Sequence, residues 1–332
     1  MTTLTVSNLG AEILLPTLDL HCHLRGTMPP HIAYSFAEKY ELRLPVLSDA
    51  GEYNFSGFND FLSLYDQIGH VIRTPDDIRK VAYQYLSSVA AGGTRYVEFM
   101  ISPSHSIANG ISFPCQISAI SDAIEQAKEE FLIDSCIIVT CVRHQGPEEA
   151  LQTANLATSI NAPYVRGFGL TGNERVFEID QFRAAFLIAE NSGLGLTAHA
   201  GEWSPAASVL QTVKALNLSR VGHGISAADD LDVLAELAES KIGFEVCLSS
   251  NIKLGACASY EQHPVRKMLD AGCSVTFSTD DPAYFQTSPQ NEMFLAIQQL
   301  KLTKEEQRKV FDDSVEMAFC NDKSKESLRE IQ

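Results

Sequence analysis

Residues Thr197-Ala-His-Ala-Gly-Glu202 directly follow the apolar run Ser192-Gly-Leu-Gly-Leu196. The segment places His199, a potential metal ligand, at the end of a predicted strand, and the carboxylate of Glu202 three residues beyond it. Three other apolar runs also end in His or Asp, namely Leu18-Asp-Leu-His-Cys-His-Leu24, Arg220-Val-Gly-His-Gly-Ile225 and Ser274-Val-Thr-Phe-Ser-Thr-Asp-Asp281. Packing alone does not explain four such strand ends. The pattern predicts one metal site at the mouth of a barrel.

The rest of the chain has the alternation that such a barrel requires. Short runs rich in Val, Ile, Leu, Phe or Thr are bounded by Gly, Ser, Asn or Pro, and the later ones are separated by amphipathic segments of helix length. The eight predicted strands are 17–24, 94–102, 135–143, 164–170, 194–200, 219–224, 242–249 and 274–280. Alternating strands and helices favour a parallel sheet, and eight repeats predict a closed (β/α)₈ TIM barrel, an α/β fold that the 332 residues can accommodate.

The segment between the first two strands is much longer than one crossover helix needs. It contains a predicted helix at 29–40, a turn-rich part at 48–57, another predicted helix at 58–69, and a helix start at Thr74-Pro75. Loops that follow barrel strands lie over the active-site face, so residues 27–92 are predicted to form a helical cap. Two or three helices are expected after Pro282, and residues 1–332 are interpreted as one domain.

Composition and charge limit the partners and the location. The net charge of -17 argues against nucleic acid and anionic membrane surfaces, but it allows a small-molecule substrate. The first eight residues show no export signal, and no run approaches the length of a membrane span. The eight cysteines form no Cys-x-x-Cys pair, and four of them lie in strand-like runs (Cys22, Cys136, Cys141 and Cys247). Buried, reduced thiols predict a cytoplasmic protein.

The predicted metal ligands are three His and one Asp. His21 and His23 are two residues apart on a strand and therefore share a face. With His199 and Asp280 they form a set that suits catalytic Zn²⁺ with one open position. The fourth predicted strand, which ends at 166–174, has no Lys that could bridge two metals, so one Zn²⁺ per chain is expected.

Three further residues are the catalytic candidates. Glu202 could move a proton onto the substrate, although a salt bridge or a helix-capping role would also explain it. His223, between two glycines, could hold or deprotonate a metal-bound water, or be structural. Asp281 diverges from its neighbour Asp280, so one carboxylate can bind metal while the other hydrogen-bonds substrate or water.

Taken together, these segments resemble the adenosine and adenine deaminase family. The matching pieces occur in the family's order: 21–26, Arg143-His144, 169–174, 199–202, 222–224, 247–251, His263-Pro264 and 278–282. The resemblance implies an amidohydrolase barrel with one Zn²⁺ on His21, His23, His199 and Asp280. It also implies that zinc-activated water attacks C6 of the purine while Glu202 protonates N1. By the same resemblance His223 orients the water, Asp281 contacts N7 and the backbone at Gly172 meets N3, so the expected substrate contacts are His23, Arg25, Gly172 and Asp281.

Two positions depart from the family pattern. Adenosine deaminases usually have Asp at the position of Arg25 and adenine deaminases have Glu, but a guanidinium donates hydrogen bonds and cannot accept them. Arg25 could meet a phosphate or carboxylate on an unusual substrate, or pair with an acidic neighbour on the cap. Gly169 replaces an acidic residue common in the family, and 281–285 looks closer to the adenine deaminases.

The expected reaction is deamination of adenosine to inosine and ammonia. The alternatives are deamination of adenine to hypoxanthine, or of a modified or anionic adenosine analogue that Arg25 recognises. A hydrolase acting on a non-purine ring amine or an amide, and a non-catalytic metal-stabilised binding protein, are hypotheses of other classes.

Overall fold

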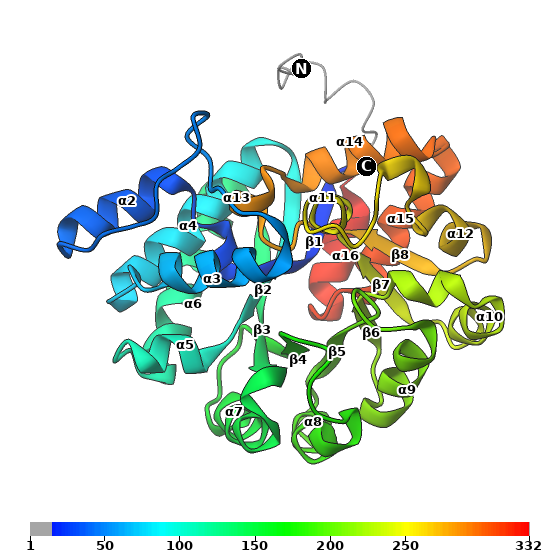
Figure 1. The fold of residues 1–332 in the computed structure, drawn as a ribbon, viewed down its shortest axis with the longest axis horizontal. Coiled ribbons are helices and arrows are strands. Elements are labelled where there is room, and N and C mark those ends of the chain that lie inside the picture. Colours follow the sequence, from blue (N-terminus) through cyan, green and yellow to red (C-terminus); the bar gives the residue numbers. More distant parts are fainter. Residues whose placement is uncertain (1–14, 332) are drawn as a thin grey trace.

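Eight strands pair in chain order into one parallel sheet in the computed structural model, which describes residues 15–331 (Figure 1). The strands are β1 (Thr17–His23), β2 (Thr94–Ile101), β3 (Asp134–Val142), β4 (Val165–Thr171), β5 (Gly195–Ala200), β6 (Arg220–His223), β7 (Gly243–Val246) and β8 (Ser274–Phe277). The predicted TIM barrel and all eight strands are confirmed. The last two strands end earlier than predicted, because Leu248-Ser-Ser-Asn251 already belongs to helix α11 (Leu248–Lys253) and the chain after Phe277 leaves strand geometry.

The barrel closes through a residue that lies beyond the last regular strand. The backbone N–H of Asp280 donates to the carbonyl of His21, and the carbonyl of Asp280 accepts from the N–H of His23, each with a donor–acceptor distance of 2.8 Å. Asp280 also forms an isolated parallel bridge with Cys22. The seam between the first and last strands is therefore built from the same residues that were predicted to bind metal.

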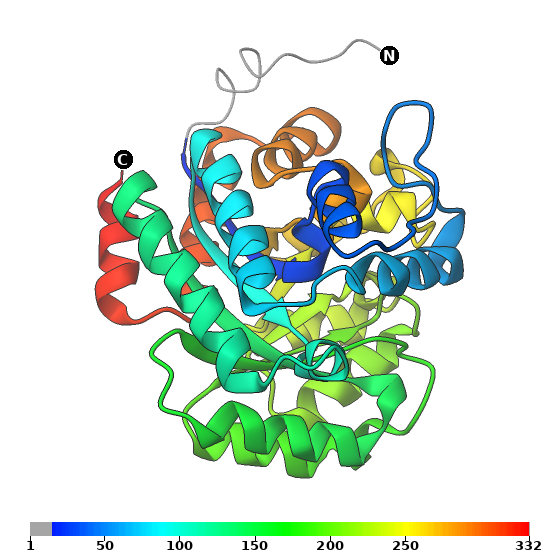
Figure 2. The ribbon, with the colours of Figure 1, turned by 90° about the vertical axis from the view of Figure 1, so that its left-hand side faces the viewer.

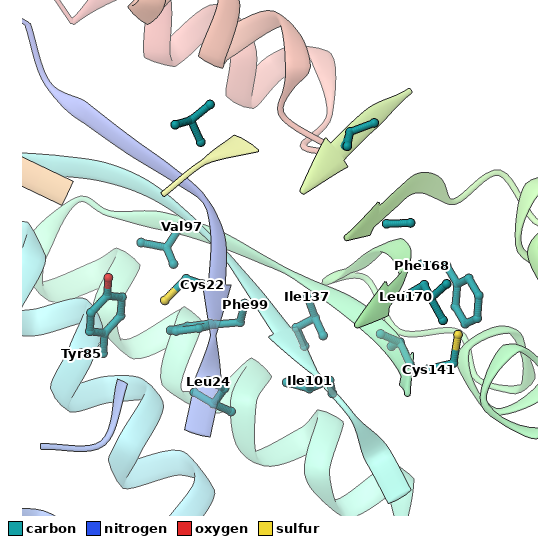
Figure 3. Close-up of a cluster of buried hydrophobic side chains, with 14 of the residues drawn as sticks. Cys22, Leu24, Tyr85, Val97, Phe99, Ile101, Ile137, Cys141, Phe168 and Leu170 are labelled. Carbon is teal, nitrogen blue, oxygen red and sulfur yellow. The ribbon is translucent and has the colours of Figure 1, made fainter. Parts of the chain in front are cut away.

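Helices surround the barrel between successive strands. They are α5 (Pro103–Ala108), α6 (Phe113–Phe131), α7 (Pro147–Ser159), α8 (Arg183–Asn191), α9 (Ala206–Leu216), α10 (Leu231–Glu239) and α12 (Val265–Asp270), followed after β8 by α13 (Pro282–Phe285), α14 (Pro289–Leu300), α15 (Lys304–Met317) and α16 (Asp322–Glu330). Short 3-10 turns lie at Leu24–Thr27, Arg143–Gln145, Ile179–Phe182, Ile225–Asp229 and Tyr260–Gln262. The main apolar core fills the space between strands and helices. In Figure 3, Cys22 of β1 lies beside Phe99 of β2 in this layer, opposite the barrel interior.

The long first connection has the helices that the sequence predicts: α2 (Pro30–Lys39), α3 (Gly57–Gly69) and α4 (Pro75–Ala91). Helix α4 begins with a capping box between Thr74 and Asp77, and Pro75 occupies its first turn. It packs against α6 and β2 as the ordinary crossover helix, so α2 and α3 are the additional elements. Helix α3 packs against α13, where the ring of Phe61 lies 5.5 Å from that of Tyr284 and 5.3 Å from that of Phe285. Figure 2 shows the blue and cyan elements of this long connection above the green helices α7 and α8.

The polar floor of the barrel holds a buried arginine. Arg220 Nη2 lies 2.6 Å from Glu98 and its Nε lies 2.6 Å from Glu245. Its third contact is the carbonyl of Met317 at 2.7 Å, and its guanidinium lies over the ring of Phe319. The chain after α15 is therefore fastened to the inside of the barrel by one cation.

The cysteines agree with the expectation of reduced thiols. All eight lie within residues 15–331 and are free, and the four predicted to be in strands are buried. The N-terminal segment, for which the sequence predicts no export signal, lies outside the described residues. Within residues 15–331, no helix is both long enough and apolar enough to span a bilayer.

Candidate active site

Four side chains from three places in the chain meet at the carboxyl ends of the strands. His199 Nε2 lies 3.1 Å from His21 Nε2 and 3.2 Å from His23 Nε2. Asp280 Oδ1 lies 3.5 Å from His21 Nε2 and 3.3 Å from His23 Nε2. All four residues are buried. The structure thus brings together the four residues that the sequence predicted as metal ligands.

The Nδ1 atoms of His21 and His199 make hydrogen bonds that determine which nitrogen of each ring can face a metal ion. His199 Nδ1 contacts the carbonyl of Leu170 at 3.0 Å, and this carbonyl can only accept. His21 Nδ1 contacts the Glu245 carboxylate at 2.7 Å. Burial alone would raise the pKa of Glu245, but the charge of Arg220 and the hydrogen bond from His21 lower it to about 2. Both Nδ1 atoms therefore donate, which leaves the two facing Nε2 atoms as the positions that a metal ion, or a single proton, can occupy.

A divalent cation fits this arrangement. Two ring nitrogens 3.1 Å apart need a positive charge between them, either a proton on one Nε2 or a metal ion. Donors around a tetrahedral Zn²⁺ stand about 3.4 Å apart, close to the separations found here. Burial would lower the pKa of His21, but the Asp280 and Glu245 carboxylates raise it to about 10, so this position stabilises positive charge. The donor set has the chemistry of a metal site.

Glu202 lies beside the cluster on a rigid turn. The backbone N–H groups of Gly201, Glu202 and Trp203 all donate to the carboxylate of Glu174, at 2.7, 3.0 and 3.3 Å. Burial raises the pKa of Glu202 well above its usual value, and the charge of Asp280 raises it further. Its buried Oε1 has no protein partner. Its surroundings therefore favour the neutral form of Glu202, from which it can donate a proton.

A chain of hydrogen bonds fixes the protonation of His223. The backbone N–H of Val265 donates to His263 Nδ1 at 3.2 Å, so the proton of that neutral ring lies on Nε2, which meets Asn251 Oδ1 at 3.2 Å. The Asn251 amide then donates to His223 Nδ1 at 3.2 Å. Burial lowers the pKa of His223 to about 3 and that of His263 to about 4, so both rings are neutral. His223 consequently carries its proton on Nε2, 3.9 Å from Glu202.

This protonation separates two possible roles of His223. His21, His199, His223 and Asp280 all have potential ligand atoms within 4.8 Å of one another, so distance alone would admit His223 as a ligand. A protonated Nε2 offers no lone pair to a metal, however, and it can donate to a nearby oxygen. The sequence left two catalytic roles open for His223, namely holding a metal-bound water or deprotonating it. The hydrogen bonds favour the first role, because a protonated Nε2 can donate but cannot accept a proton. Both His223 (φ 59°) and Asp280 (φ 63°) have left-handed backbone conformations, which non-glycine residues adopt at a cost and which concentrate at functional sites.

Asp281 does not diverge from Asp280 as expected for an extended chain, because a carboxylate oxygen of each lies within 4.8 Å of the other and the backbone at Asp280 is left-handed (φ 63°). The two carboxylates nevertheless have different partners. Asp280 Oδ2 accepts a 2.6 Å hydrogen bond from Ser250, whereas Asp281 Oδ1 is buried without a protein partner. Burial and the charge of Asp280 raise the pKa of Asp281 well above normal. A Cβ atom at Gly26 would lie 1.9 Å from Asp281 Oδ1 and 2.7 Å from its Cα, so only glycine fits here.

A cleft with about 800 Å³ of empty space, its open mouth included, leads to these groups. Helix α3 contributes an apolar wall, and Gly172 (φ +96°) faces His144 on the other side. The prediction that His144 packs above the barrel end agrees with its position in the cleft wall. The ligand atoms of His23, His199 and Asp280, the Glu202 carboxyl group and the unpartnered oxygen of Asp281 thus share one cleft.

Sequence reasoning assigned no role to the residues that support the site. They are Glu174, Glu245, Ser250, Asn251 and His263. Glu245 had a usable signal, because a carboxylate inside the apolar strand Gly243-Phe-Glu-Val246 needs a buried cationic or hydrogen-bonding partner. Asn251 and His263 had none beyond their place in the family-like segments.

Comparison with known proteins agrees with this geometry. The family profile described as adenosine deaminase matches residues 16–331. This chain belongs to the adenosine deaminase family. It is accordingly a hydrolase that acts on C–N bonds. An adenine deaminase of Rhizobium leguminosarum bv. trifolii is 36% identical over 314 residues, covering 95% of this chain and 98% of the relative.

Solved structures of the family superpose closely on the chain. The crystal structure of an adenine deaminase from Arthrobacter aurescens has a TM-score of 0.89 at 28% identity, with 95% of this chain and 97% of that chain covered. An amidohydrolase from Burkholderia ambifaria, solved with bound Zn, also has a TM-score of 0.89, at 26% identity and with 99% and 92% covered.

Proposed function

We propose that this protein hydrolyses the exocyclic amine of a 6-aminopurine, using one Zn²⁺ bound by His21, His23, His199 and Asp280. The observation that carries the proposal is the convergence of three imidazole nitrogens and one Asp280 carboxylate oxygen beside Glu202, a carboxyl whose pKa burial raises. Zinc in this position would supply a Lewis acid that lowers the pKa of a coordinated water to about 7. The zinc-containing relative from Burkholderia supports this choice of metal.

The protein groups around the metal divide the remaining work. Glu202 donates its proton to the ring nitrogen next to the reacting carbon, which makes that carbon more electrophilic. The resulting carboxylate then takes the proton that the attacking water loses and passes it to the amine, which departs as ammonia. The Nε2–H of His223 holds the attacking water. Asp281, whose Oδ1 has no protein partner, contacts the purine together with the backbone at Gly172 and the edge of His23. Burial of these groups excludes bulk water and strengthens each interaction.

Adenosine and adenine are the two candidate substrates for this reaction. Adenosine is the substrate expected from the motifs, and the products would be inosine and ammonia. Adenine is the second candidate, because curated relatives such as the Rhizobium protein are adenine deaminases over nearly their whole length. Barrel and cap act together in either case, because α3 forms a wall of the cleft. We place the enzyme in the cytoplasm, consistent with its free cysteines.

The test combines ammonia release with the change in purine ultraviolet absorbance. Zinc-loaded wild-type protein should deaminate adenine or adenosine, and Glu202→Gln should lower the rate at least about 100-fold. Glu239→Gln, on the exposed face of α10, is the matched control and should behave as wild type. Metal content should be equal in all three proteins. Absence of ammonia release by the zinc-loaded wild type from adenine, from adenosine and from charged derivatives such as adenosine 5′-phosphate would refute the proposal.

A further inference from the structure

Arg25 is a cation of the cleft wall with few partners. It follows β1 directly, two residues after His23, and its side chain reaches the C-terminal part of α3. There Nη2 lies 3.5 Å from the carbonyls of both Tyr65 and Asp66, at the outer limit of a hydrogen bond. The guanidinium carbon is 5.0 Å from the centre of the Tyr65 ring. Its Nε is buried and has no hydrogen-bond partner.

The charge of Arg25 also lacks a carboxylate partner. Among residues 15–331, no carboxylate oxygen lies within 4.0 Å of its guanidinium. The suggested pairing with an acidic neighbour on the cap is therefore absent from the structure, since Asp66 offers only its main-chain carbonyl. Arg220, by contrast, is bound by two carboxylates. A partly buried cation without such compensation is costly unless a ligand supplies the negative charge.

Arg25 lines a side chamber of the active-site cleft. The chamber has about 470 Å³ of empty space, open parts included, and its wall shares His23, Tyr65, Ser102 and His105 with the main cleft. None of the described residues that line it is acidic. Burial, together with the charge of Arg25, lowers the pKa of His105 to about 3, so the imidazole is neutral and can donate one N–H. Most of the chamber wall is apolar, so Arg25 supplies its one full positive charge and a few neutral groups supply hydrogen bonds, next to the proposed metal ligand His23.

We propose that Arg25 forms an oxyanion subsite, and that the substrate is a 6-aminopurine bearing a carboxylate or phosphate group. This inference rests on the proposed deamination and names its substrate class. The anion binds the free donors of Arg25, with Ser102 and His105 as neutral donors in the same chamber. A protein with a net charge of -17 needs such a local cation to bind an anionic substrate. Holding helix α3 in place does not explain an arginine at this position, because the hydrogen bonds from Arg25 to α3 are long.

The experiment compares charged and neutral substrates in matched pairs. Adenosine 5′-phosphate is compared with adenosine, and 9-(carboxymethyl)adenine with 9-ethyladenine, by kcat/KM of the zinc-loaded enzyme. Wild type should favour the charged member of at least one pair by about 10-fold or more, as expected for a charge-assisted hydrogen bond. The preferred pair distinguishes phosphate from carboxylate. The preference should shrink as salt rises.

Variants at Arg25 assign the preference to its charge. Arg25→Met should reduce the charged-to-neutral ratio by about 10-fold or more, and Arg25→Lys should retain part of it. The control Arg183→Met removes an exposed arginine paired with Asp180 and should leave the ratio unchanged. Binding is also measured without turnover, by the melting temperature of the protein with product-like ligands. Inosine 5′-phosphate should raise the melting temperature of wild type more than inosine does, and 9-(carboxymethyl)hypoxanthine more than 9-ethylhypoxanthine. In Arg25→Met the charged ligands should lose this advantage.

Each other outcome overturns the inference in a recognisable way. If wild type deaminates neutral purines as efficiently as charged ones, the oxyanion subsite is wrong while the proposed deamination stands. If Arg25→Met lowers both members of each pair equally, Arg25 merely fastens α3. If zinc-loaded wild type releases ammonia from none of the four purines, the proposed function itself fails.

Discussion

Replacement of Glu245 by Gln tests how the protein prepares His21 for metal binding. Glu245 is fully buried in β7 and accepts hydrogen bonds from His21 Nδ1, Arg220 Nε and Thr197 Oγ1, at 2.7, 2.6 and 2.8 Å. Glutamine has the same shape but offers one oxygen and one NH₂ group. If its NH₂ faces His21, the imidazole must accept there, and its proton moves to Nε2, the atom that faces the metal. If its NH₂ faces Arg220, two donors oppose each other in a buried site.

The expected size of the effect follows from these two choices. Partners behind a metal ligand typically change metal affinity by about 10- to 100-fold, and we expect Glu245→Gln to weaken zinc binding by that amount. The same change removes one of two carboxylates from the buried Arg220, which destabilises the fold by up to about 3–5 kcal/mol. Glu98→Gln is the matched control, because Glu98 is the other carboxylate on Arg220 and does not touch His21.

Metal affinity is measured by competition with a chelator, and folding by circular dichroism and urea unfolding. Both variants should lose stability, but only Glu245→Gln should lose zinc affinity by 10-fold or more. Wild-type zinc affinity in a folded Glu245→Gln protein would refute the tautomer argument. An equal loss in Glu98→Gln would show that weakening the barrel floor, and not the protonation of His21, governs the metal.

Two further predictions concern buried groups outside the ligand set. Asn251→Asp replaces the donor to His223 Nδ1 by an acceptor, which moves the imidazole proton away from Nε2, and kcat should fall about 100-fold at equal metal content; an unchanged kcat would disprove the proposed donor role. Burial raises the pKa of Glu292 to about 7, so the folded protein keeps a proton that the unfolded chain loses from about pH 4.5 upward, and this stabilisation disappears as the pH rises through 7. The free energy of unfolding of wild type relative to Glu292→Gln should therefore fall by up to about 3 kcal/mol between pH 5 and 8, and a constant difference in urea unfolding would contradict the assigned pKa.

The barrel was predictable because its signals are local. Each strand is a short β-branched or aromatic run that ends in turn-forming residues, and Thr74-Pro75 marks the start of α4 by capping chemistry alone. The ligand positions were predictable for a related reason: carboxyl ends of parallel strands meet at one edge, so His21, His199 and Asp280 had to converge once the barrel was assumed.

The support of the site was not predictable, because it depends on long-range contacts. Asn251 and His263 are 12 residues apart, and only folding of the β7–β8 connection brings His263 to Asn251 and Asn251 to His223. Strand ends at β7 and β8 were overestimated because backbone bonds to other strands, and not propensity, decide where the chain leaves the sheet. The neighbours of Arg25 likewise come from a cap whose docking no sequence pattern specifies.

The position of Asp280 links closure of the barrel to the proposed metal site. The main chain of Asp280 links the first strand to the last through two hydrogen bonds and an isolated bridge. If its carboxylate also binds the proposed zinc ion, that ion connects the same two strands through His21, His23 and Asp280. Opening of this seam would then release the metal, so that metal loss and local opening of the barrel would occur together.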